Sequence, residues 1–372
     1  MKKLGLLVNP IAGMGGAVGL KGTDGEEVLG QAITLGAKPI SPKRSTEYLS
    51  ALRRELQAIE LHVGPGQMGE LEALEVALDF TVVGGPLTGK TSAADTRRVA
   101  DSMERKGVDL LVFCGGDGTA RDILDSIDQR VVSLGIPSGV KMHSSVFAVT
   151  PVAAAALTIE HFRGRATSAE REVMDIDEDA YRQGRLSARL YGYLRVPFEP
   201  SFIQGTKEAS LGTQSEREAQ YSIAKRIVEE MNPDTYYVLG PGTTIKAITD
   251  YLGLQKTVLG IDIIRDRKLV LKDVNEEQIL RILADGQSKV IVTPIGGQGF
   301  IFGRGNQQIS AEVLRRVGKG GVVVVATRTK INAIPGMKLR IDTGDLALDA
   351  QFAGYVRVVV DYNEEIVMKV DR

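Results

Sequence analysis

Along the first 150 residues, apolar and polar positions follow the pattern of strands alternating with helices. The apolar run 4–8 predicts a strand that ends in a glycine-bearing turn at 9–19. Leu49, Leu52 and Leu56 then recur at helical spacing. The wholly apolar run 110–113 is typical of a parallel strand covered on both faces. The pattern therefore predicts an N-terminal α/β domain built on a parallel sheet.

The pattern changes after residue 165. Between 185 and 196 the even positions are mostly apolar and the odd ones mostly polar, which indicates an antiparallel strand with one solvated face. A polar stretch, 204–217, leads into a region from 218 to 327 where strand and helix patterns alternate again. The chain then returns to strand patterning, with 355–361 and 365–370 flanking a short turn, which predicts a hairpin.

These shifts predict an α/β plus β fold in three parts. The N-terminal α/β parallel-sheet domain, suited to binding a nucleotide, takes residues 1–155. An antiparallel β-region combines 165–205 with 333–372, because the two separated β-stretches could share one sheet. An additional C-terminal α/β module occupies 215–330. The chain has no short-period repeat, coiled-coil heptad or low-complexity tract.

Composition excludes several classes of protein. The chain has 372 residues, 43% of them hydrophobic and 25% charged, and 46 basic side chains nearly cancel 47 acidic ones. A dedicated nucleic-acid or membrane surface is therefore not expected. The apolar run after Met1, Lys2 and Lys3 is too short for a signal peptide, and the single Cys114 fits a reducing compartment. We expect a cytoplasmic homo-oligomer that acts on a small molecule, with no nucleic-acid or membrane partner.

The most informative motif lies where the strand at 110–113 meets the next helix. It is called the Asp117 turn here, and it consists of Gly115, Gly116, Asp117, Gly118 and Thr119. Backbone N–H groups and the helix dipole converge there with little side-chain bulk, so phosphate is the natural ligand. A carboxylate in such a turn repels phosphate unless it meets Mg²⁺ or a hydroxyl proton. Asp117 is thus the candidate catalytic residue; the alternative is that it only caps the helix.

Further glycine and polar positions near predicted strand ends are candidates for the same nucleotide- and phosphate-binding site. They are Asn9, Gly13, Gly15, Gly16, Arg121, Asp122, Ser138, Gly139, Lys141 and His143. Lys141 and His143 could neutralise phosphate charge from the side opposite the helix, or could be a solvated lysine and a packed histidine. The glycines after the first strand could equally serve a tight turn.

These motifs resemble those of the superfamily of NAD kinases, diacylglycerol kinases and sphingosine kinases. The resemblance starts from GGDGT after an apolar strand and from NPIAG at 9–13. The longer strings GGDGTARDI at 115–123 and GIPSGVKMHSSVFA at 135–148 are similar to the ATP-NAD kinase subgroup that includes acetoin-catabolism protein X. The segment TPIGGQGFIFGRGNQ at 293–307 extends the resemblance over most of the chain.

The resemblance implies a kinase that transfers a phosphoryl group from ATP, or from polyphosphate, to a hydroxyl with the help of Mg²⁺. In NAD kinases the acceptor is the 2′-OH of the adenosine ribose. Carried over to this chain, Asp117 would orient or deprotonate the hydroxyl, and the glycines and Thr119 would form the phosphate cradle. Asp122 matches the acidic residue of the lipid-kinase motif, but Arg121 stands where that motif has asparagine, which disfavours a lipid acceptor. The β-stretch that follows the first domain, 165–205, also lacks the Asn-Glu pair with which NAD kinases hold the dinucleotide.

A competing motif, GGPLTGKT at 84–91, has the spacing of a P-loop. A P-loop ATPase would place Lys90 on the β- and γ-phosphates and Thr91 on Mg²⁺, with Asp117 as the acidic metal partner. Against this interpretation, two glycines separate Asp117 from its apolar run, and Gly84 follows about the third strand instead of the first. Otherwise Lys90 is a solvated side chain and a nearby threonine caps the next helix.

Two glycine clusters in the second α/β module are candidates for another site. They follow the apolar runs 236–239 and 290–293, and their residues are Gly240, Gly242, Thr243, Thr244, Gly296, Gly297, Arg304 and Asn306. The first cluster resembles the ligand loop of sugar-phosphate isomerases, and Arg304 could bind phosphate bidentately. We hypothesise that the module binds the far half of a dinucleotide or a phosphorylated effector. A non-catalytic sensor, or structural turns with Arg304 paired to a surface acid, would explain the same residues.

Overall fold

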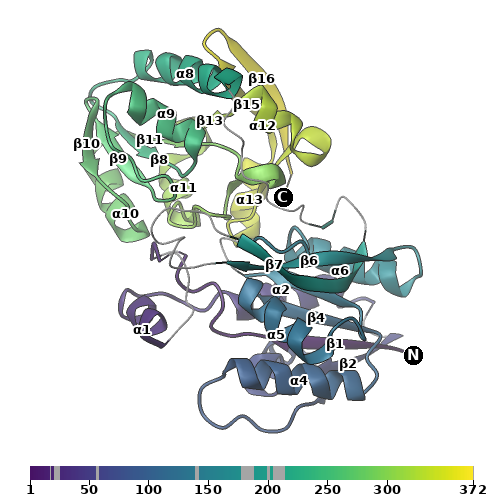
Figure 1. The fold of residues 1–372 in the computed structure, drawn as a ribbon. Helices are drawn as coiled ribbons and strands as arrows, with labels where there is room; N and C mark the ends of the chain where they lie inside the picture. Colours follow the sequence, from purple (N-terminus) through teal and green to yellow (C-terminus); the bar gives the residue numbers. More distant parts are fainter. Residues whose placement is uncertain are drawn as a thin grey trace. The chain divides into compact units, whose positions relative to one another are not determined.

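The computed structural model describes residues 1–16, 18–20, 26–55, 58–138, 142–176, 188–198, 202–203 and 214–371. The chain divides into two compact units, coloured purple to teal and green to yellow in Figure 1. Unit 1 comprises Met1–Met14 and Lys21–Thr206, and unit 2 comprises Gly15–Leu20 and Lys207–Arg372. Each unit has its own sheet and its own core.

Unit 1 is built on a parallel five-stranded sheet in the order β3-β2-β1-β4-β5. Its strands are β1 (Lys2–Val8), β2 (Ile59–Val63), β3 (Thr81–Val82), β4 (Leu110–Gly115) and β5 (Ser133–Pro137). Every residue of β4 is buried, as expected for a strand with helices on both faces. The predicted N-terminal parallel sheet is confirmed.

The helices of unit 1 form two groups on either side of this sheet (Figure 1). The helices are α1 (Glu26–Thr34), α2 (Ser41–Leu52), α3 (Glu70–Glu75), α4 (Ala93–Arg105), α5 (Asp117–Ile127) and α6 (Pro151–Phe162), with a 3-10 turn at Gly66–Met68. Helix α2 packs on α3 and α6, where the buried Tyr48 and Thr158 hydroxyls lie 3.0 Å apart, and α4 packs on α5. Because α2 and α5 each connect parallel strands, their N-termini lie at the carboxyl edge of the sheet.

A separate antiparallel pair, β6 (Thr167–Ile176) and β7 (Ala188–Phe198), covers α5. A Cβ on Gly192 of β7 would lie 2.7 Å from Leu124 Cδ2 of α5. A side chain at position 192 would therefore push the hairpin away from the helix. The predicted antiparallel strand is confirmed over its described part, 188–196.

Unit 2 contains a mixed nine-stranded sheet in the order β10-β9-β8-β11-β13-β15-β16-β14-β12. The strands are β8 (Tyr236–Leu239), β9 (Asp262–Arg265), β10 (Lys268–Leu271), β11 (Ser288–Val292), β12 (Phe300–Phe302), β13 (Val322–Val325), β14 (Lys338–Ile341), β15 (Gly354–Asp361) and β16 (Glu364–Asp371). Strands β8, β11, β13 and β15 run parallel. They form the α/β part of the unit.

Helices cover both faces of this parallel part. They are α8 (Gln214–Glu229), α9 (Thr243–Tyr251), α10 (Glu276–Asp285), α11 (Ala311–Val317), α12 (Arg328–Asn332) and α13 (Leu346–Phe352), with 3-10 turns at Gly296–Gln298, Lys319–Gly321 and Pro335–Met337. Val238 of β8 packs into the core that includes α10 and α11, whereas its neighbour Leu239 packs into the core of α8 and α9. The two cores follow from the alternation of side chains along each strand.

The prediction that 165–205 and 333–372 share one sheet is wrong in the described part of the chain. Strands β6 and β7 pair only with each other, while β14, β15 and β16 belong to the nine-stranded sheet. The reason is that β15 pairs in parallel with β13, with Val358 opposite Val324, and so buries its apolar face in the core of unit 2. The β15–β16 hairpin is present as predicted. The other domain limits stay a prediction.

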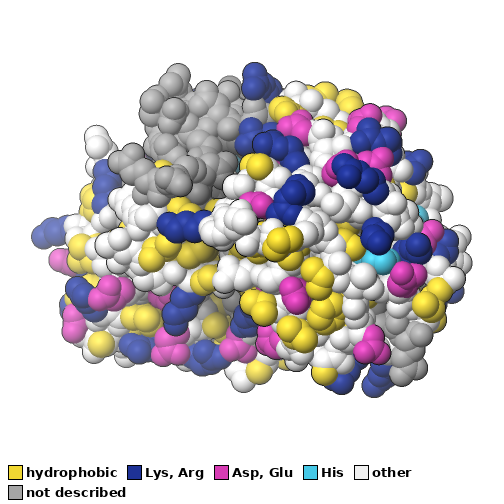
Figure 2. Space-filling view, turned by 90° about the horizontal axis from the view of Figure 1, so that it is seen from below, with side chains coloured by type: hydrophobic (Ala, Val, Ile, Leu, Met, Phe, Trp, Pro, Cys, Tyr) yellow, Lys and Arg dark blue, Asp and Glu magenta, His cyan; other side chains and the backbone are white. Residues whose placement is uncertain are grey.

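Two surface properties bear on possible partners. Within the described residues, no helix is long and apolar enough to cross a membrane. On the face seen in Figure 2, Lys and Arg side chains are interspersed with Asp and Glu side chains. This mixture matches the near-zero formal charge of the sequence.

Candidate functional site

The Asp117 turn lies at the carboxyl end of β4, where the predicted junction of strand, glycine turn and helix is present. A Cβ on Gly115 would lie 2.3 Å from Thr119 Oγ1, so only glycine lets the first turn of α5 approach the strand end. A Cβ on Gly116 would meet nothing within 4 Å. Gly116 therefore borders open space at the N-terminus of α5, where phosphate could approach the backbone N–H groups.

Asp117 is the first residue of α5, but its carboxylate binds a different segment of the chain. Its Oδ2 accepts the His143 N–H at 2.8 Å, and its Oδ1 accepts the Ser144 N–H at 2.9 Å. The His143 Nδ1 lies 3.7 Å from Oδ2, and the Asp117 side chain is only 10% exposed. Two amide donors thus fix the carboxylate, and each oxygen retains a lone pair for another donor. The structure brings Asp117 and His143 together.

The segment that holds Asp117 is itself held by β6. The Ser145 N–H donates to the Glu172 carbonyl at 2.9 Å, and the Ser145 hydroxyl donates to the Glu172 carboxylate at 2.8 Å. The Met174 N–H donates to the Ser144 hydroxyl at 2.9 Å. Sequence reasoning missed Ser144, Ser145 and Glu172, although both serines lie in the string at 135–148 on which the resemblance depends.

Asn9 connects the turn after β1 to the Asp117 turn. Its Nδ2 donates to Thr119 Oγ1 at 2.9 Å, and its backbone N–H donates to the Cys114 carbonyl at 2.9 Å. Gly13 has φ +79°, a conformation that favours glycine. Gly15 and Gly16 belong to unit 2, so they are not placed relative to Asp117.

Ser138 also lies beside the Asp117 turn. Its backbone N–H donates to the Gly115 carbonyl at 3.1 Å, and its side chain is 2% exposed. The Ser138 hydroxyl is buried and has no hydrogen-bond partner among the described residues. A buried polar atom without a partner is costly, so this hydroxyl is suited to meet a ligand. Gly139 and Lys141, two other predicted site residues, lie outside the described residues.

Arg121 and Asp122 are not directed to the N-terminus of α5. The Asp122 carboxylate binds the Arg97 guanidinium of α4 at 2.8 Å. The Arg121 guanidinium lies 6.0 Å from the ring centre of Tyr191 on β7. Both side chains therefore contact the elements that flank α5, away from its glycine turn.

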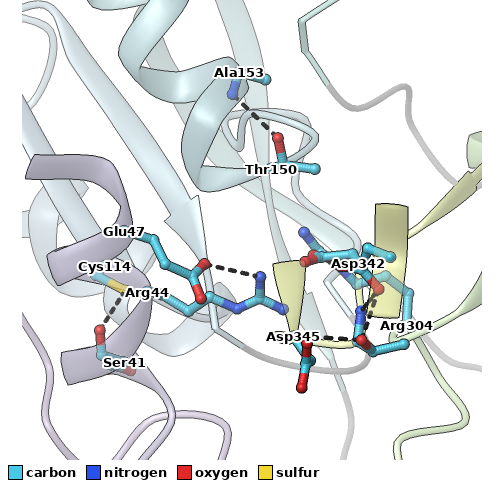
Figure 3. Close-up of polar contacts among 11 residues, drawn as sticks. Ser41, Arg44, Glu47, Cys114, Thr150, Ala153, Arg304, Asp342 and Asp345 are labelled. Carbon is cyan, nitrogen blue, oxygen red and sulfur yellow. Dashed lines mark hydrogen bonds and ion pairs between the residues drawn. The ribbon is translucent and has the colours of Figure 1, made fainter. Parts of the chain in front are cut away.

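The N-terminal turn of α2 adds residues that the sequence did not single out (Figure 3). The Ser41 hydroxyl donates to the Ala12 carbonyl at 3.1 Å, and its own carbonyl accepts from Cys114 Sγ at 3.4 Å. One turn later Arg44 is 5% exposed and lies 3.5 Å from the Glu47 carboxylate. A buried guanidinium at the carboxyl edge of a parallel sheet could attract phosphate. A basic residue in a polar helix is typical of a solvated face, so the local pattern carries no signal for Arg44.

Two titratable groups near α2 are strongly affected by burial. Burial raises the pKa of the Cys114 thiol to about 12, which fits the expected role of a small core residue and not a nucleophile. Burial, with a smaller contribution from neighbouring Glu75, raises the pKa of Glu72 to about 7. Glu72 is 3% exposed, and its Oε2 has no hydrogen-bond partner among the described residues.

The segment at 84–91 does not have the geometry of a P-loop. Strand β3 before it has two residues and lies at the edge of the sheet. Helix α4 begins at Ala93, after Lys90, and is capped by Ser92, whose N–H and hydroxyl bind the Asp95 carboxylate. Asp95 thus occupies the helix N-terminus where a P-loop would bind phosphate. Lys90 is exposed, as in the alternative interpretation.

The two glycine clusters of unit 2 differ in the structure. The turn at 240–244, called the Gly242 turn here, joins β8 to α9, and its N-cap Gly242 has φ +113°. In the second cluster, Arg304 Nε lies 3.2 Å from the Asp342 carboxylate, and both residues are buried (Figure 3). Asn306 Nδ2 donates to the Ile301 carbonyl. Gly296 and Gly297 form a short 3-10 turn. A buried acid, not a surface acid, is the partner of Arg304.

Comparison with protein families gives two matches. Residues 4–165 match the model of the ATP-NAD kinase N-terminal domain, and residues 232–370 match that of the ATP-NAD kinase C-terminal domain. Together the two matches cover most of the chain. A comparison with curated proteins gave no match. The narrower resemblance to the acetoin-catabolism subgroup stays a prediction.

Proposed function

Because the chain belongs to the ATP-NAD kinase family, and is therefore a phosphotransferase with a hydroxyl acceptor, we propose that it phosphorylates the ribose 2′-OH of NAD to give NADP. ATP is the proposed donor, with polyphosphate as the alternative. The observation that carries the proposal is the position of Asp117. Its carboxylate is fixed by two backbone N–H groups beside the open N-terminus of α5.

The residues present fit a phosphorylated ligand. Gly116 leaves the first-turn N–H groups of α5 open to approach, and the unpartnered Ser138 hydroxyl lies at the same strand edge. Thr119 is held by Asn9 and fixes the fold of the turn. These groups would bind the donor phosphates through backbone amides and hydroxyls.

Mg²⁺ is expected to arrive with the nucleotide. The described residues contain no group of three His, Cys, Asp or Glu side chains arranged to hold a metal ion. Mg²⁺ is commonly held by substrate phosphates, water and one or two carboxylates. Asp117 supplies the carboxylate within the turn. When bound, Mg²⁺ would neutralise charge on the transferred phosphoryl group.

The role of Asp117 is to position the acceptor. Phosphoryl transfer proceeds through a loose transition state, so alignment of the hydroxyl contributes more than the strength of a base. The free lone pairs of the fixed carboxylate can accept the hydroxyl proton of the acceptor. His143 lies next to this carboxylate, with its Nδ1 3.7 Å from Asp117 Oδ2, and so belongs to the same site.

The proposal is tested by product formation. Purified full-length protein with Mg²⁺, ATP and NAD should yield NADP, detected with an NADP-specific dehydrogenase. Parallel reactions replace ATP by polyphosphate and NAD by NADH or other alcohols, with labelled donor to follow the phosphoryl group. Protein carrying Asp117→Asn controls for contaminating kinases. If no donor yields NADP but a different alcohol is phosphorylated, NAD is not the acceptor, although the protein is still a phosphotransferase with a hydroxyl acceptor.

A further inference from the structure

The carboxyl edge of the parallel strands in unit 2 includes the adjacent ends of β8 and β11. These strands are neighbours, with Leu239 opposite Ile291, and the Gly240 N–H continues the pairing with the Ile291 carbonyl at 2.9 Å. After β8 the chain enters α9 on one face of the sheet, while the next α-helix after β11, α11, lies on the other face. Ligands of open α/β sheets bind where successive connections leave to opposite faces.

The Gly242 turn at this point presents the uncapped N-terminus of α9. Gly242 has no side chain to cap the helix, and its φ of +113° requires glycine. Thr244, the second residue of α9, is fully buried, and its hydroxyl has no hydrogen-bond partner among the described residues. Cα–Cβ bonds in a helix tilt toward its N-terminus, so the Thr244 side chain leaves the backbone on the side of the end that would receive an anion.

A lysine from a third strand end supplies positive charge. Lys330 of α12, which follows β13, donates from Nζ to Thr293 Oγ1 at 3.1 Å. Thr293 follows β11, and a Cβ on Gly242 would lie 3.0 Å from its Cγ2. The ammonium, Thr293 and the Gly242 turn are therefore consecutive neighbours along the edge. Their arrangement has the donors that a phosphate group needs.

Lys330 interacts with one buried carboxylate, that of Glu216. Burial lowers the pKa of Lys330 to about 8, and the carboxylate of Glu216 on α8 partly offsets this effect. The Thr327 hydroxyl donates to Glu216 at 2.7 Å. An anion beside Lys330 would further stabilise the ammonium, because an opposite charge favours the charged form.

We propose that unit 2 binds a phosphate group, from a phosphate monoester or a pyrophosphate, between the N-terminus of α9 and Lys330. All residues of this site belong to unit 2, and the proposal does not depend on the proposed reaction. The bound group could belong to the dinucleotide substrate or to an independent phosphorylated metabolite. The chemistry of recognition is the same for both sources.

Calorimetric titration of the full-length chain with pyrophosphate tests the site. Lys330→Gln should weaken one binding step by at least about 10-fold, as expected for loss of a charge-assisted contact. Lys246→Gln removes a positive charge from the exposed side of the same helix α9 and should leave the affinity within about 2-fold. Equal affinities in wild type and Lys330→Gln would overturn the proposal.

A second variant keeps the test valid if Lys330→Gln fails to fold. Thr244→Val preserves shape and removes a hydroxyl that has no partner in the described structure, so folding should not suffer. It should weaken pyrophosphate binding about 3- to 10-fold. A folded Thr244→Val protein with unchanged affinity would also count against the site.

Steady-state kinetics distinguish the two sources of phosphate. If the site holds the dinucleotide, Thr244→Val should raise KM for NAD and leave kcat nearly unchanged. If it holds a separate metabolite, KM for NAD should be unchanged while pyrophosphate binding is weakened. If the protein makes no NADP at all, the proposed function fails, but the pyrophosphate titration still decides whether this site exists.

Discussion

The Asp117 turn of unit 1 and the Gly242 turn of unit 2 use the same backbone arrangement with different charges. In each, a buried parallel strand ends in glycines and a helix begins directly afterwards. Unit 1 places a carboxylate on the first residue of its helix, fixed by the amides of His143 and Ser144. Unit 2 has threonines at the corresponding helix start and a lysine nearby. The backbone offers phosphate binding in both places, but only the first turn has a group able to accept a hydroxyl proton.

The two turns therefore differ in whether they are suited only to bind phosphate or also to take part in its transfer. An uncapped helix N-terminus attracts an anion whatever the chemistry that follows. A carboxylate there opposes phosphate binding, so we propose that Asp117 serves the reaction in addition to binding the His143 and Ser144 amides. Unit 2 lacks such a carboxylate at its turn and is suited to hold a phosphate without transferring it. The predictions below test this contrast.

The largest effect is expected from Asp117→Asn. Loss of the proton-accepting carboxylate should lower kcat by about 10²- to 10⁴-fold, the usual contribution of a positioned acid or base. Nucleotide binding, measured by calorimetric titration, should remain because the amides of the turn are unchanged. The corresponding change in unit 2, Thr244→Val, should leave kcat within about 2-fold.

The asparagine amide could also displace the segment that donates to Asp117, so a structural control is required. Ser145→Ala removes the hydroxyl contact between this segment and Glu172 and leaves the carboxylate in place. We expect Ser145→Ala to lower kcat far less than Asp117→Asn. A loss of equal size in both variants would mean that the position of the segment, and not the carboxylate, limits the reaction.

The two adjacent glycines of the Asp117 turn should respond differently to substitution. Gly115→Ala places a Cβ 2.3 Å from Thr119 Oγ1, so chemical denaturation should show a loss of about 1–3 kcal/mol in the free energy of unfolding. Gly116→Ala meets no atom within 4 Å and should leave stability nearly unchanged while weakening ATP binding. The reverse order of effects would show that the turn is packed differently from this description.

Buried charges near the two turns should give stability opposite dependences on pH. The pKa of Glu72 rises from 4.5 to about 7 on folding, so the folded state binds the extra proton and stability falls as pH rises through this window. The pKa of Lys330 falls from 10.5 to about 8, so its destabilising effect is present below pH 8 and is relieved as pH rises toward 10.5.

Glu72→Gln isolates the first of these effects. The variant should be about 1–2 kcal/mol more stable than wild type at pH 8 and nearly equal to it at pH 4.5. Denaturant unfolding at several pH values measures the difference. The exposed neighbour Glu75 provides a comparison, because Glu75→Gln removes a charge without relieving burial; since Glu75 also raises the pKa of Glu72, its removal should give a smaller gain with the same pH dependence. A stability gain that does not depend on pH would contradict the assigned cause.

Local patterns predicted the backbone of both turns, because a short apolar run followed by glycines admits few other structures. They did not predict which strands pair. The strands at 354–361 and 364–371 have the same alternation as β6 and β7, and only the apolar face of the unit 2 core assigns β15 beside β13. Sheet partners are set by contacts distant in sequence, which a single pattern does not contain.

The site was predictable to a similar degree. Asp117, Asn9 and Thr119 were found because each stands at a strand end in a recognisable motif. Arg44 and Lys330 each lie in a polar helix, and only the fold shows that Arg44 is buried and that Lys330 is half-buried and donates to Thr293. Burial of a basic residue depends on its three-dimensional neighbours, so it leaves no local trace in the sequence.

The smallest effect is expected at Lys90, the lysine with the better sequence motif. Lys90 lies before α4, whose N-terminus is already occupied by the Asp95 carboxylate. Lys330 belongs to no recognised motif, but it contacts Thr293 beside the uncapped N-terminus of α9. Lys90→Ala should therefore change kcat/KM and pyrophosphate affinity by less than about 2-fold. A loss beyond about 10-fold in turnover would mean that Asp95 gives way to a nucleotide phosphate and that the P-loop interpretation holds. Unchanged turnover would mean that the P-loop spacing at 84–91 does not predict phosphate binding in this chain. The group already bound at the helix N-terminus, here the Asp95 carboxylate, would then be the better guide.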